Sequence, residues 1–305
     1  MPSATLSPPA PVAVFAYNRP THLARALASL AANPEAGQTS VTVYCDAARR
    51  PEDRGIVAEV RQVAESATGF GSLETVFRES NLGLARSVIS GVGVILKRHG
   101  RVIVVEDDLL LSPHFLRFMN EGLARYADEP RVGSIHGYCY PVASPLPATF
   151  FLRGADCWGW ATWSRAWAHF EPDGSALLAQ LRARRLTHSF DLDGHFPFTR
   201  MLEDQILARN NSWAIRWRAA CFLKGMLTLY PGRTLVDNIG NDSSGTHCGT
   251  SMAYSAAVSL VPVPVDTIPI EESAAAAAAF GRFLGRQVGF RLRAAGAIRR
   301  VLGFV

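Results

Sequence analysis

Three consecutive acids follow a short apolar run in the first half of the chain. Residues 101–105 are mostly β-branched, come directly after Gly100, and lead into Glu106, Asp107 and Asp108. Such a run predicts a central strand of a parallel sheet that is covered on both faces. The acids would then lie at the carboxyl end of that strand, where open α/β sheets bind ligands.

Neighbouring carboxylates repel one another unless a cation lies between them. A hard divalent ion, held by one or two carboxylates and completed by phosphate oxygens of a substrate, would relieve that repulsion. The alternative is that Asp107 and Asp108 form a turn at the start of a helix, since Ser112-Pro113 resembles an N-cap followed by proline at the first helical position.

Strand and helix patterns alternate around these acids. Apolar runs over 11–17, 41–46, 73–77 and 101–106 predict strands, and helical spacing follows each of them. Four such units imply a parallel sheet with right-handed crossovers. Further on, Trp160, Trp163 and Trp167 have helical spacing, which predicts one buried helix face. The expected fold class is α/β, with a mostly parallel central sheet flanked by helices and a mixed second half.

We expect one large domain with short additions at both ends. Residues 1–10 would be a flexible arm, without the features of a signal peptide or membrane anchor. Residues 11–140 would form the ligand-binding half and 141–270 the second half of the same domain. Residues 271–305 would form a basic tail. A hydrophobic content of 48% with 19% charged residues is sufficient for a sizeable core.

Charge and cysteine usage narrow the class of protein. The five cysteines are scattered without any Cys-x-x-Cys pair, which argues against disulfides and a zinc site and favours a cytoplasmic location. The net charge is +5, but residues 274–305 hold six arginines and no acid, so the rest of the chain is nearly neutral. We see no basic stripe with interleaved aromatic residues, and therefore expect no nucleic-acid partner.

Four of the six tail arginines, at positions 282, 286, 293 and 300, lie on one side of a predicted amphipathic helix over 274–305. Such a helix is typical of segments that lie on a membrane surface, here the inner face of the membrane. Docking against the body of the protein or against a second subunit is the alternative. The charges exclude a membrane-spanning segment.

The acidic segment carries a family resemblance. Glu106-Asp107-Asp108, followed by Phe115 and Phe118, resembles the Glu-Asp-Asp metal motif of N-acetylglucosaminyltransferase I and related glycosyltransferases of the GT-A fold, which is Rossmann-like. The resemblance implies that Asp108 holds Mn²⁺ or Mg²⁺ bound to the diphosphate of a nucleotide sugar. It also implies that Glu106 and Asp107 contact the sugar and ribose.

The same resemblance assigns roles to residues after the earlier strands. Tyr17, Asn18 and Arg19 would line the nucleotide, and Asp46 would accept a hydrogen bond from the imide N–H of uracil, which makes UDP the expected nucleotide. Arg86 would reach the phosphates or the base, aided by the N–H groups of its helix start. From the residues alone, Asn18-Arg19 and Asp46 could equally be helix caps, and Arg86 a surface arginine.

Candidates for the acceptor side follow in the second half. Glycosyl transfer needs a base for the acceptor hydroxyl, and the family resemblance places it in an acidic pair at a helix start, which suggests Asp204 with Glu203 next. Acids early in a helix also favour its dipole without any other role. Asp156 and Trp158 are the expected contacts to sugar, by hydrogen bonding and stacking. His247 matches the place of a metal- or phosphate-binding histidine in several GT-A enzymes, although N-acetylglucosaminyltransferase I itself has no clear equivalent.

The function predicted from the sequence is metal-dependent transfer of a sugar from a nucleotide sugar to a glycan or lipid-linked acceptor in polysaccharide biosynthesis, with inversion. The sugar would be a hexose or N-acetylhexosamine. One alternative is a sugar-phosphate nucleotidyltransferase, which should have a glycine-rich basic loop where this chain has Tyr17 to Pro20. The other is a catalytically silent carbohydrate-binding scaffold, which should have lost a metal-binding acid.

Overall fold

The computed structural model describes the backbone of residues 8–240 and 252–301, with side chains over 8–240 and 253–288. The strands are β1 (Val12–Ala16), β2 (Ser40–Cys45), β3 (Ser72–Phe77), β4 (Arg101–Glu106), β5 (Leu109–Leu111), β6 (Val132–His136), β7 (Thr149–Arg153), β8 (Trp160–Trp163), β9 (Leu227–Pro231) and β10 (Val236–Asn238). The α-helices are α1 (Pro20–Ala31), α2 (Arg54–Ser66), α3 (Gly83–His99), α4 (Phe115–Arg125), α5 (Ser164–Trp167), α6 (Gly174–Ala183), α7 (Thr187–Phe190), α8 (Phe198–Ile206), α9 (Trp213–Leu223) and α10 (Ala274–Val301).

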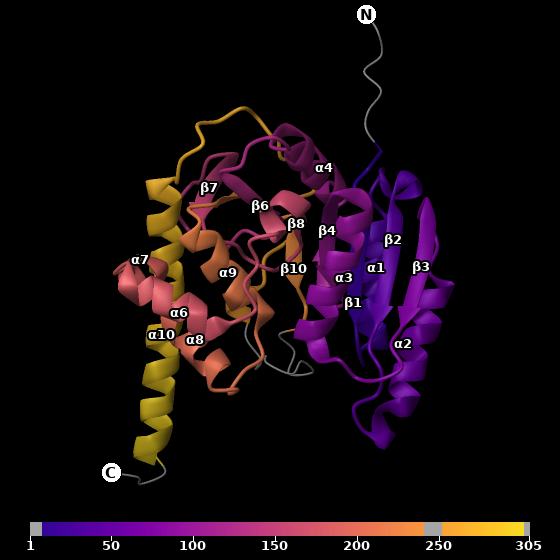
Figure 1. The fold of residues 1–305 in the computed structure, drawn as a ribbon, viewed down its shortest axis with the longest axis horizontal. Coiled ribbons are helices and arrows are strands. Elements are labelled where there is room, and N and C mark those ends of the chain that lie inside the picture. Colours follow the sequence, from indigo (N-terminus) through magenta and orange to yellow (C-terminus); the bar gives the residue numbers. More distant parts are fainter. Residues whose placement is uncertain (1–7, 241–251, 302–305) are drawn as a thin grey trace, which may run out of the picture.

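One eight-stranded sheet runs through the molecule in the order β3-β2-β1-β4-β8-β6-β9-β7 (Figure 1). Its first four strands are parallel, with Val14 of β1 beside Val43 of β2 and Val105 of β4. β8 is antiparallel to both of its neighbours, and β7 is antiparallel to β9. The predicted α/β class, with a parallel first half and a mixed second half, is therefore confirmed.

The order of the strands creates a crevice at one edge. The chain leaves β1 toward β2 and β3 on one side, then returns to form β4 on the other side of β1. The connections after β1 and after β4 therefore run in opposite directions. At such a topological switch point the carboxyl ends of neighbouring strands open a ligand-binding crevice.

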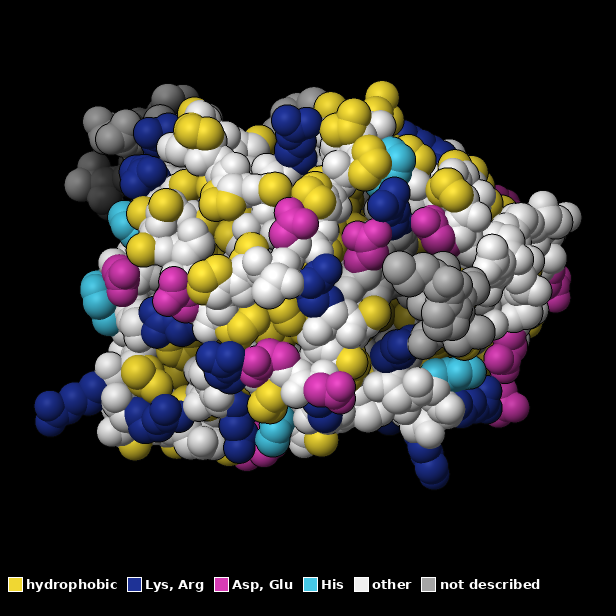
Figure 2. Space-filling model, turned by 90° about the horizontal axis from the view of Figure 1, so that it is seen from above, with side chains coloured by type: hydrophobic (Ala, Val, Ile, Leu, Met, Phe, Trp, Pro, Cys, Tyr) yellow, Lys and Arg dark blue, Asp and Glu magenta, His cyan; other side chains and the backbone are white. Residues whose placement is uncertain are grey.

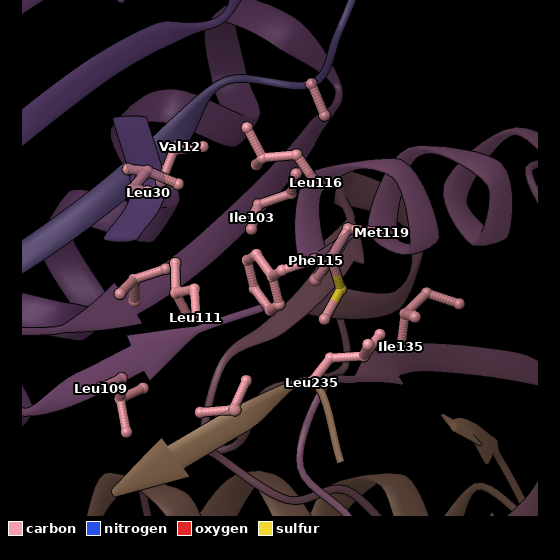
Figure 3. Close-up of a cluster of buried hydrophobic side chains, with 14 of the residues drawn as sticks. Val12, Leu30, Ile103, Leu109, Leu111, Phe115, Leu116, Met119, Ile135 and Leu235 are labelled. Atoms are coloured by element: carbon pink, nitrogen blue, oxygen red, sulfur yellow. The ribbon is translucent and has the colours of Figure 1, made fainter. Parts of the chain in front are cut away.

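Helices cover both faces of the sheet, and β1 alternates between the two cores. Val12 and Val14 pack with α1, α2 and α4, whereas Ala13 and Phe15 pack with α3, α6, α8 and α9. Figure 3 shows the first core, where Val12, Ile103 and Phe115 converge from β1, β4 and α4. Because both faces are buried, β1 and β4 are apolar throughout apart from the ends of β4.

The tryptophan stripe is not a helix, contrary to the prediction. Trp160 and Trp163 are the two ends of β8, which lies between β4 and β6. Three residues apart on a strand, they point to opposite faces, so Trp160 packs in one core and Trp163 in the other. Trp167 ends the short helix α5. Their expected burial does hold for Trp160 and Trp163.

The alternative role of the acids as a helix start is wrong. After Asp108 the chain forms β5, which pairs with β10, and α4 begins only at Phe115. The residue before α4 is His114, so Ser112 is not its N-cap; the Ser112 hydroxyl donates to Ser259 O at 2.6 Å and accepts from the N–H of His114. The two acids are therefore separated from the helix by a strand.

The first part of the tail helix α10 docks on the body. Ala276, Phe280 and Leu284 are buried, and Phe280 meets the ring of Tyr140 with 4.8 Å between centroids. In Figure 1 the helix runs along the edge of the molecule and its end extends past α8. Of the two expectations for the tail, docking on the body is thus the observed one for this part. None of the helices over 8–240 and 252–301 is long and apolar enough to cross a membrane.

Charged side chains of both signs mix on the face that carries the amino ends of the parallel strands. Figure 2 shows this face, where basic, acidic and apolar groups alternate without a continuous basic stripe. The view gives no support for a nucleic-acid surface there.

Candidate functional site

The site lies at the switch point between β1 and β4. Asp107 and Asp108 directly follow β4 and are only 3% and 6% exposed. Arg19, three residues after β1, donates from Nη2 to Asp107 Oδ1 and, at 3.1 Å, to Asp108 Oδ2. The N–H of Tyr17 also donates to Asp107 Oδ2 at 3.3 Å. These bonds join the ends of the two strands around a shared group of charges.

This cluster has more negative than positive charge. Burial, reinforced by the neighbouring Asp108 and Asp107, raises the pKa of Glu106 to about 8. Burial also raises the pKa of Asp107 to about 6, even though Arg19 acts in the opposite direction. One guanidinium therefore does not compensate three carboxyl groups. A further cation at this place would be favoured electrostatically.

Asp108 has the atom best suited to such a cation. Its Oδ1 is buried and has no hydrogen-bond partner among the described residues, while Oδ2 is bonded to Arg19. Over the described ranges, no three His, Cys, Asp or Glu side chains converge as a complete metal site. A cation here would take one or two oxygens from the protein and the others from ligand and water, the usual situation for Mg²⁺ with nucleotides. His247, the other predicted metal ligand, lies outside the described residues.

Gly240 lies against this carboxylate, which the sequence did not reveal. β10 pairs with β5, and the next N–H, of Ile239, donates to Asp108 O at 2.9 Å. A Cβ on Gly240 would be 2.8 Å from Arg19 Nη1 and 2.9 Å from Asp108 Cγ, and closer still to Asp108 Oδ2. Any larger residue here would require the Asp108 carboxylate, the Arg19 guanidinium or the backbone to move. The local sequence around Gly240 does not indicate this contact.

The residues next to Arg19 shape the adjoining loop. The Tyr17 hydroxyl donates to Asp53 Oδ2 at 3.0 Å and accepts from the N–H of Arg49 at 3.1 Å. It thereby orders the connection that follows β2. Asn18 is half-buried beside it and has no hydrogen bond among the described residues.

Asp46 already has several backbone partners. The carboxylate is buried and accepts from the N–H groups of Ala47, Leu82 and Gly83 at 2.8–2.9 Å. The last two open α3, so Asp46 caps that helix across the sheet. A carboxylate offers about four acceptor positions, so little capacity is left for a base. Arg86, in the first turn of α3, is exposed and has no polar partner within the described part of the chain.

Asp156 and Trp158 flank Cys157, which lies near the acids, because the charges of Glu106 and Asp108 act on its thiol. Trp158 precedes β8, whose first residue, Trp160, pairs with Val104 of β4. The N–H of Trp158 donates to Nε2 of the buried His136 at 3.1 Å. Asp156 accepts from the Tyr140 hydroxyl at 3.1 Å. Burial, then the charges of Asp156, Glu106 and Asp108, raise the pKa of the intervening Cys157, as expected if these acids surround it.

The predicted catalytic pair is placed differently from the expectation. Glu203 and Asp204 lie in the second half of α8, whose first turn contains no acid. Asp204 Oδ1 accepts from Arg209 at 3.0 Å and Arg200 at 3.2 Å, and the bond from Arg209 lowers the pKa of Asp204. Glu203 pairs with Arg182 at 2.8 Å. Neither has a described bond to the acidic cluster.

A hollow of about 730 Å³ lies away from the acids, between three loops. It is lined by parts of 139–146, 232–234 and 256–261. None of its lining residues is acidic, and Arg233 is its one lining cation. It offers no ligand set for a divalent cation.

Comparisons with known proteins give distant likenesses only. No family model matches the chain, and no curated protein does. A mannosyltransferase from Pyrobaculum calidifontis, solved with GDP-Man and Mn²⁺, is 14% identical over 74% of this chain and 71% of its own, with a TM-score of 0.42. UDP-glucose pyrophosphorylase, solved with UDP-glucose, is 10% identical over 73% and 90%, with a TM-score of 0.37. Glucosyl-3-phosphoglycerate synthase from Mycobacterium tuberculosis, solved with Mn²⁺, UDP and glucosyl-3-phosphoglycerate, is 12% identical over 58% and 67%, with a TM-score of 0.36. At such low TM-scores, the case for an activity rests on the site itself.

Proposed function

We propose that this chain is a metal-dependent glycosyltransferase that moves a sugar from a nucleotide sugar to a glycan or lipid-linked acceptor. The observation that carries the proposal is the under-compensated acidic cluster at the β1–β4 switch point, with the buried, unpartnered Oδ1 of Asp108. A protein keeps such a cluster at a cost in stability, which favours a functional role. The resemblance of Glu106-Asp107-Asp108 to the Glu-Asp-Asp motif supports the same interpretation.

Asp108 would hold Mn²⁺ or Mg²⁺ through Oδ1, and the cation would neutralise the nucleoside diphosphate as it leaves. Arg19 would remain beside the phosphates and stabilise the negative charge of Asp107 and Asp108. The exposed guanidinium of Arg86 would contact the diphosphate from the first turn of α3. Tyr17, Asn18 and Asp46 would form the side of the crevice that receives the nucleotide, with uridine as the proposed nucleoside.

In the proposed reaction, the acceptor hydroxyl oxygen attacks the anomeric carbon, and the bond from that carbon to the diphosphate oxygen breaks. The bonding electrons leave with the nucleoside diphosphate, and the acceptor proton passes to a carboxylate. Asp204, ionised beside its two arginines, is the proposed base, and direct displacement would invert the anomeric centre. Trp158 and Asp156 would hold the sugar beside Glu106.

The test is release of nucleoside diphosphate from a panel of UDP-, GDP- and dTDP-sugars with and without Mn²⁺. Asp108→Ala should abolish the metal-dependent turnover, whereas Glu121→Ala, which removes an exposed acid paired with Arg117 on α4, should not. Undiminished turnover in Asp108→Ala would refute the metal assignment. Formation of a nucleoside triphosphate from pyrophosphate and a nucleotide sugar would identify a nucleotidyltransferase instead.

The base is tested separately from the metal. Asp204→Asn should reduce transfer to an acceptor by at least 100-fold, the typical contribution of a general base being about 10²–10⁴, while hydrolysis of the donor by water continues. Glu121→Gln, at an exposed acid of α4, is the control, and Glu203→Gln tests the second candidate. If transfer and hydrolysis fall together, or neither changes, Asp204 is not the base.

Contact with a membrane surface is the remaining part of this proposal. Four arginines lie beyond the docked part of α10, at positions 291, 293, 299 and 300. Basic residues near an anionic bilayer contribute about 1 kcal/mol each. The chain should co-sediment with vesicles containing phosphatidylglycerol but not with neutral ones, and replacing these four arginines by glutamine should abolish sedimentation. Equal binding by the substituted chain would contradict a role for the tail.

A further inference from the structure

Two arginines of α9 are equally buried but differ in their partners. Arg216 and Arg218 are each 8% exposed. Arg216 donates from Nε to Ser212 O at 3.2 Å and from Nη1 to Pro172 O at 3.1 Å. Within the described part of the chain, Arg218 has one long bond, from Nη1 to Ala155 O at 3.3 Å, and its buried Nε has no partner. Arg216 is thus satisfied by carbonyl groups, whereas Arg218 is not.

Arg218 also lacks a carboxylate partner. Among the described residues none of the ion pairs includes it or Arg216, so the two arginines differ in their hydrogen bonds and not in ion pairs. Burial raises the pKa of Asp191, and the charge of Arg218 acts to lower it, so the two side chains interact. Asp191 nevertheless accepts its hydrogen bond from the N–H of Thr199, at 2.6 Å, and not from Arg218. A buried cation without a counter-charge is unfavourable by several kcal/mol, roughly, even after relaxation. Such a group is expected where an anion binds.

Arg218 is held between an aromatic ring and closely packed backbone. Its guanidinium carbon lies 3.8 Å from the centre of the Phe198 ring, so the planar group is held in one orientation. Phe198 is the first residue of α8, whose N-terminal N–H groups favour negative charge. On the other side, a Cβ on Gly154 would lie 3.2 Å from Arg218 Cγ, so the chain packs closely there as well.

The loop that leads to α8 is strained. Leu192 and Asp193 have φ values of 51° and 54°, and Gly194 follows with 83°. Left-handed backbone is unfavourable by about 1–2 kcal/mol for a residue other than glycine. Strain of this kind is retained where surrounding structure imposes it, often at ligand sites. This loop lies four residues before Phe198, whose ring contacts Arg218.

We propose that Arg218 anchors an anion subsite on the acceptor side, which takes a carboxylate or phosphate group of the acceptor. The identification of this anion as part of the acceptor rests on the proposed transferase function. The chain connects the subsite to the donor side, because Ala155 accepts from Arg218 and Cys157, two residues on, has its pKa raised by burial and then by the charges of Asp156, Glu106 and Asp108. A planar guanidinium matches the oxygen pairs of carboxylate and phosphate and does not match a neutral sugar.

Binding of three probes by the full chain, without metal or nucleotide, tests the subsite. Glucuronate carries a carboxylate, glucose 6-phosphate a phosphate, and glucose neither. At matched ionic strength, one or both anions should raise Tm, and glucose should not. A shift with glucuronate alone identifies an acidic-sugar acceptor, and a shift with glucose 6-phosphate alone identifies a phosphorylated one. No shift with either anion overturns the proposal.

Variants identify the residue. Arg218→Met should lose the anion shift yet unfold at the wild-type Tm or higher, because it removes an uncompensated charge and keeps the apolar stem. Arg218→Lys should bind the anion at least tenfold more weakly, and provides the comparison if the methionine variant does not fold. Arg216→Met should lower Tm and keep the shift.

Two results would overturn the proposal. The first is a rise in Tm with the anion that persists in Arg218→Met. The second is an Arg218→Met variant destabilised as much as Arg216→Met, together with no anion-induced rise in Tm of the wild type. Donor hydrolysis with Mn²⁺ is measured separately. A failed anion subsite would leave that activity and its loss in Asp108→Ala unchanged, so the two proposals fail independently.

Discussion

Replacing Gly240 by alanine tests the geometry of the acidic cluster with a single methyl group. The backbone of Gly240 does not have a positive φ, so alanine is compatible with its conformation. The new Cβ would nevertheless be 2.8 Å from Arg19 Nη1 and 2.9 Å from Asp108 Cγ, distances that real side chains do not adopt. Either the Asp108 carboxylate or the backbone after β10 must move.

The size of the effect follows from what moves. If Asp108 turns away, its charged hydrogen bond with Arg19 is lost, which costs about 1.5–3 kcal/mol; if the backbone yields instead, overpacking costs about 1–3 kcal/mol. For a chain of 305 residues, this corresponds to a fall in Tm of about 2–5 °C. A displaced ligand should weaken the metal more than the fold. Changes next to metal ligands typically reduce affinity or activity by about 10- to 100-fold.

The assay is a titration of Mn²⁺ in the presence of UDP, read as a rise in Tm, together with hydrolysis of UDP-sugars. Gly93→Ala is the matched control, since Gly93 lies inside α3 and a Cβ added there would have no atom within 4 Å. Alanine there should raise stability by about 1 kcal/mol and leave the Mn²⁺ response unchanged. A Gly240→Ala variant with wild-type Mn²⁺ affinity and hydrolysis would refute the assignment of Asp108.

Three further predictions concern the charges of the site. The metal-free protein should lose stability as the pH rises from about 4.5 to about 8. The reason is that the folded pKa of Glu106 is raised from 4.5 to about 8, so folding favours its protonated form. In thermal melts, the stability of Glu106→Gln should depend less steeply on pH, and an equally steep dependence would contradict this origin. Arg19→Met should lower the free energy of unfolding by about 3 kcal/mol, since it leaves Asp107 and Asp108 unpaired, and Mn²⁺ with UDP should recover part of the loss in urea melts. Asp46→Asn should destabilise by about 0.5–2 kcal/mol through the lost cap of α3; an unchanged preference for uridine over guanosine sugars would leave Asp46 a structural residue only.

The parallel half of the fold could be predicted because its signals are local. Each apolar run ends at a polar residue or glycine and is followed by helical spacing, and the acids after β4 are placed by chain order alone. Trp160 and Trp163 were misassigned because residues three apart fit both a helix face and a strand buried on both sides. Deciding between these requires the neighbouring strands β4 and β6, which no local pattern contains.

The positions within α8 show the same limit. Asp191 accepts from the N–H of Thr199 and so fixes the helix start from eight residues away. Glu203 and Asp204 consequently lie beyond the first turn. Gly240 and Arg218 could not be found from the sequence either, because their importance comes from contacts with distant residues, Asp108 in one case and Ala155 and Phe198 in the other.

The two proposed subsites have opposite and complementary charges. The cluster at Asp108 lacks a cation, and Arg218 lacks an anion, although both are buried where an unbalanced charge is unfavourable. They form no ion pair with each other in the described chain. Residues 155–158 connect them, and the charges of Glu106 and Asp108 act on the thiol of Cys157 in this connection. If these groups served only the stability of the fold, a direct ion pair between them, or apolar residues at both places, would stabilise it more. Their separation is what a transferase needs, because a metal-bound diphosphate and an anionic acceptor repel each other unless each has its own counter-charge.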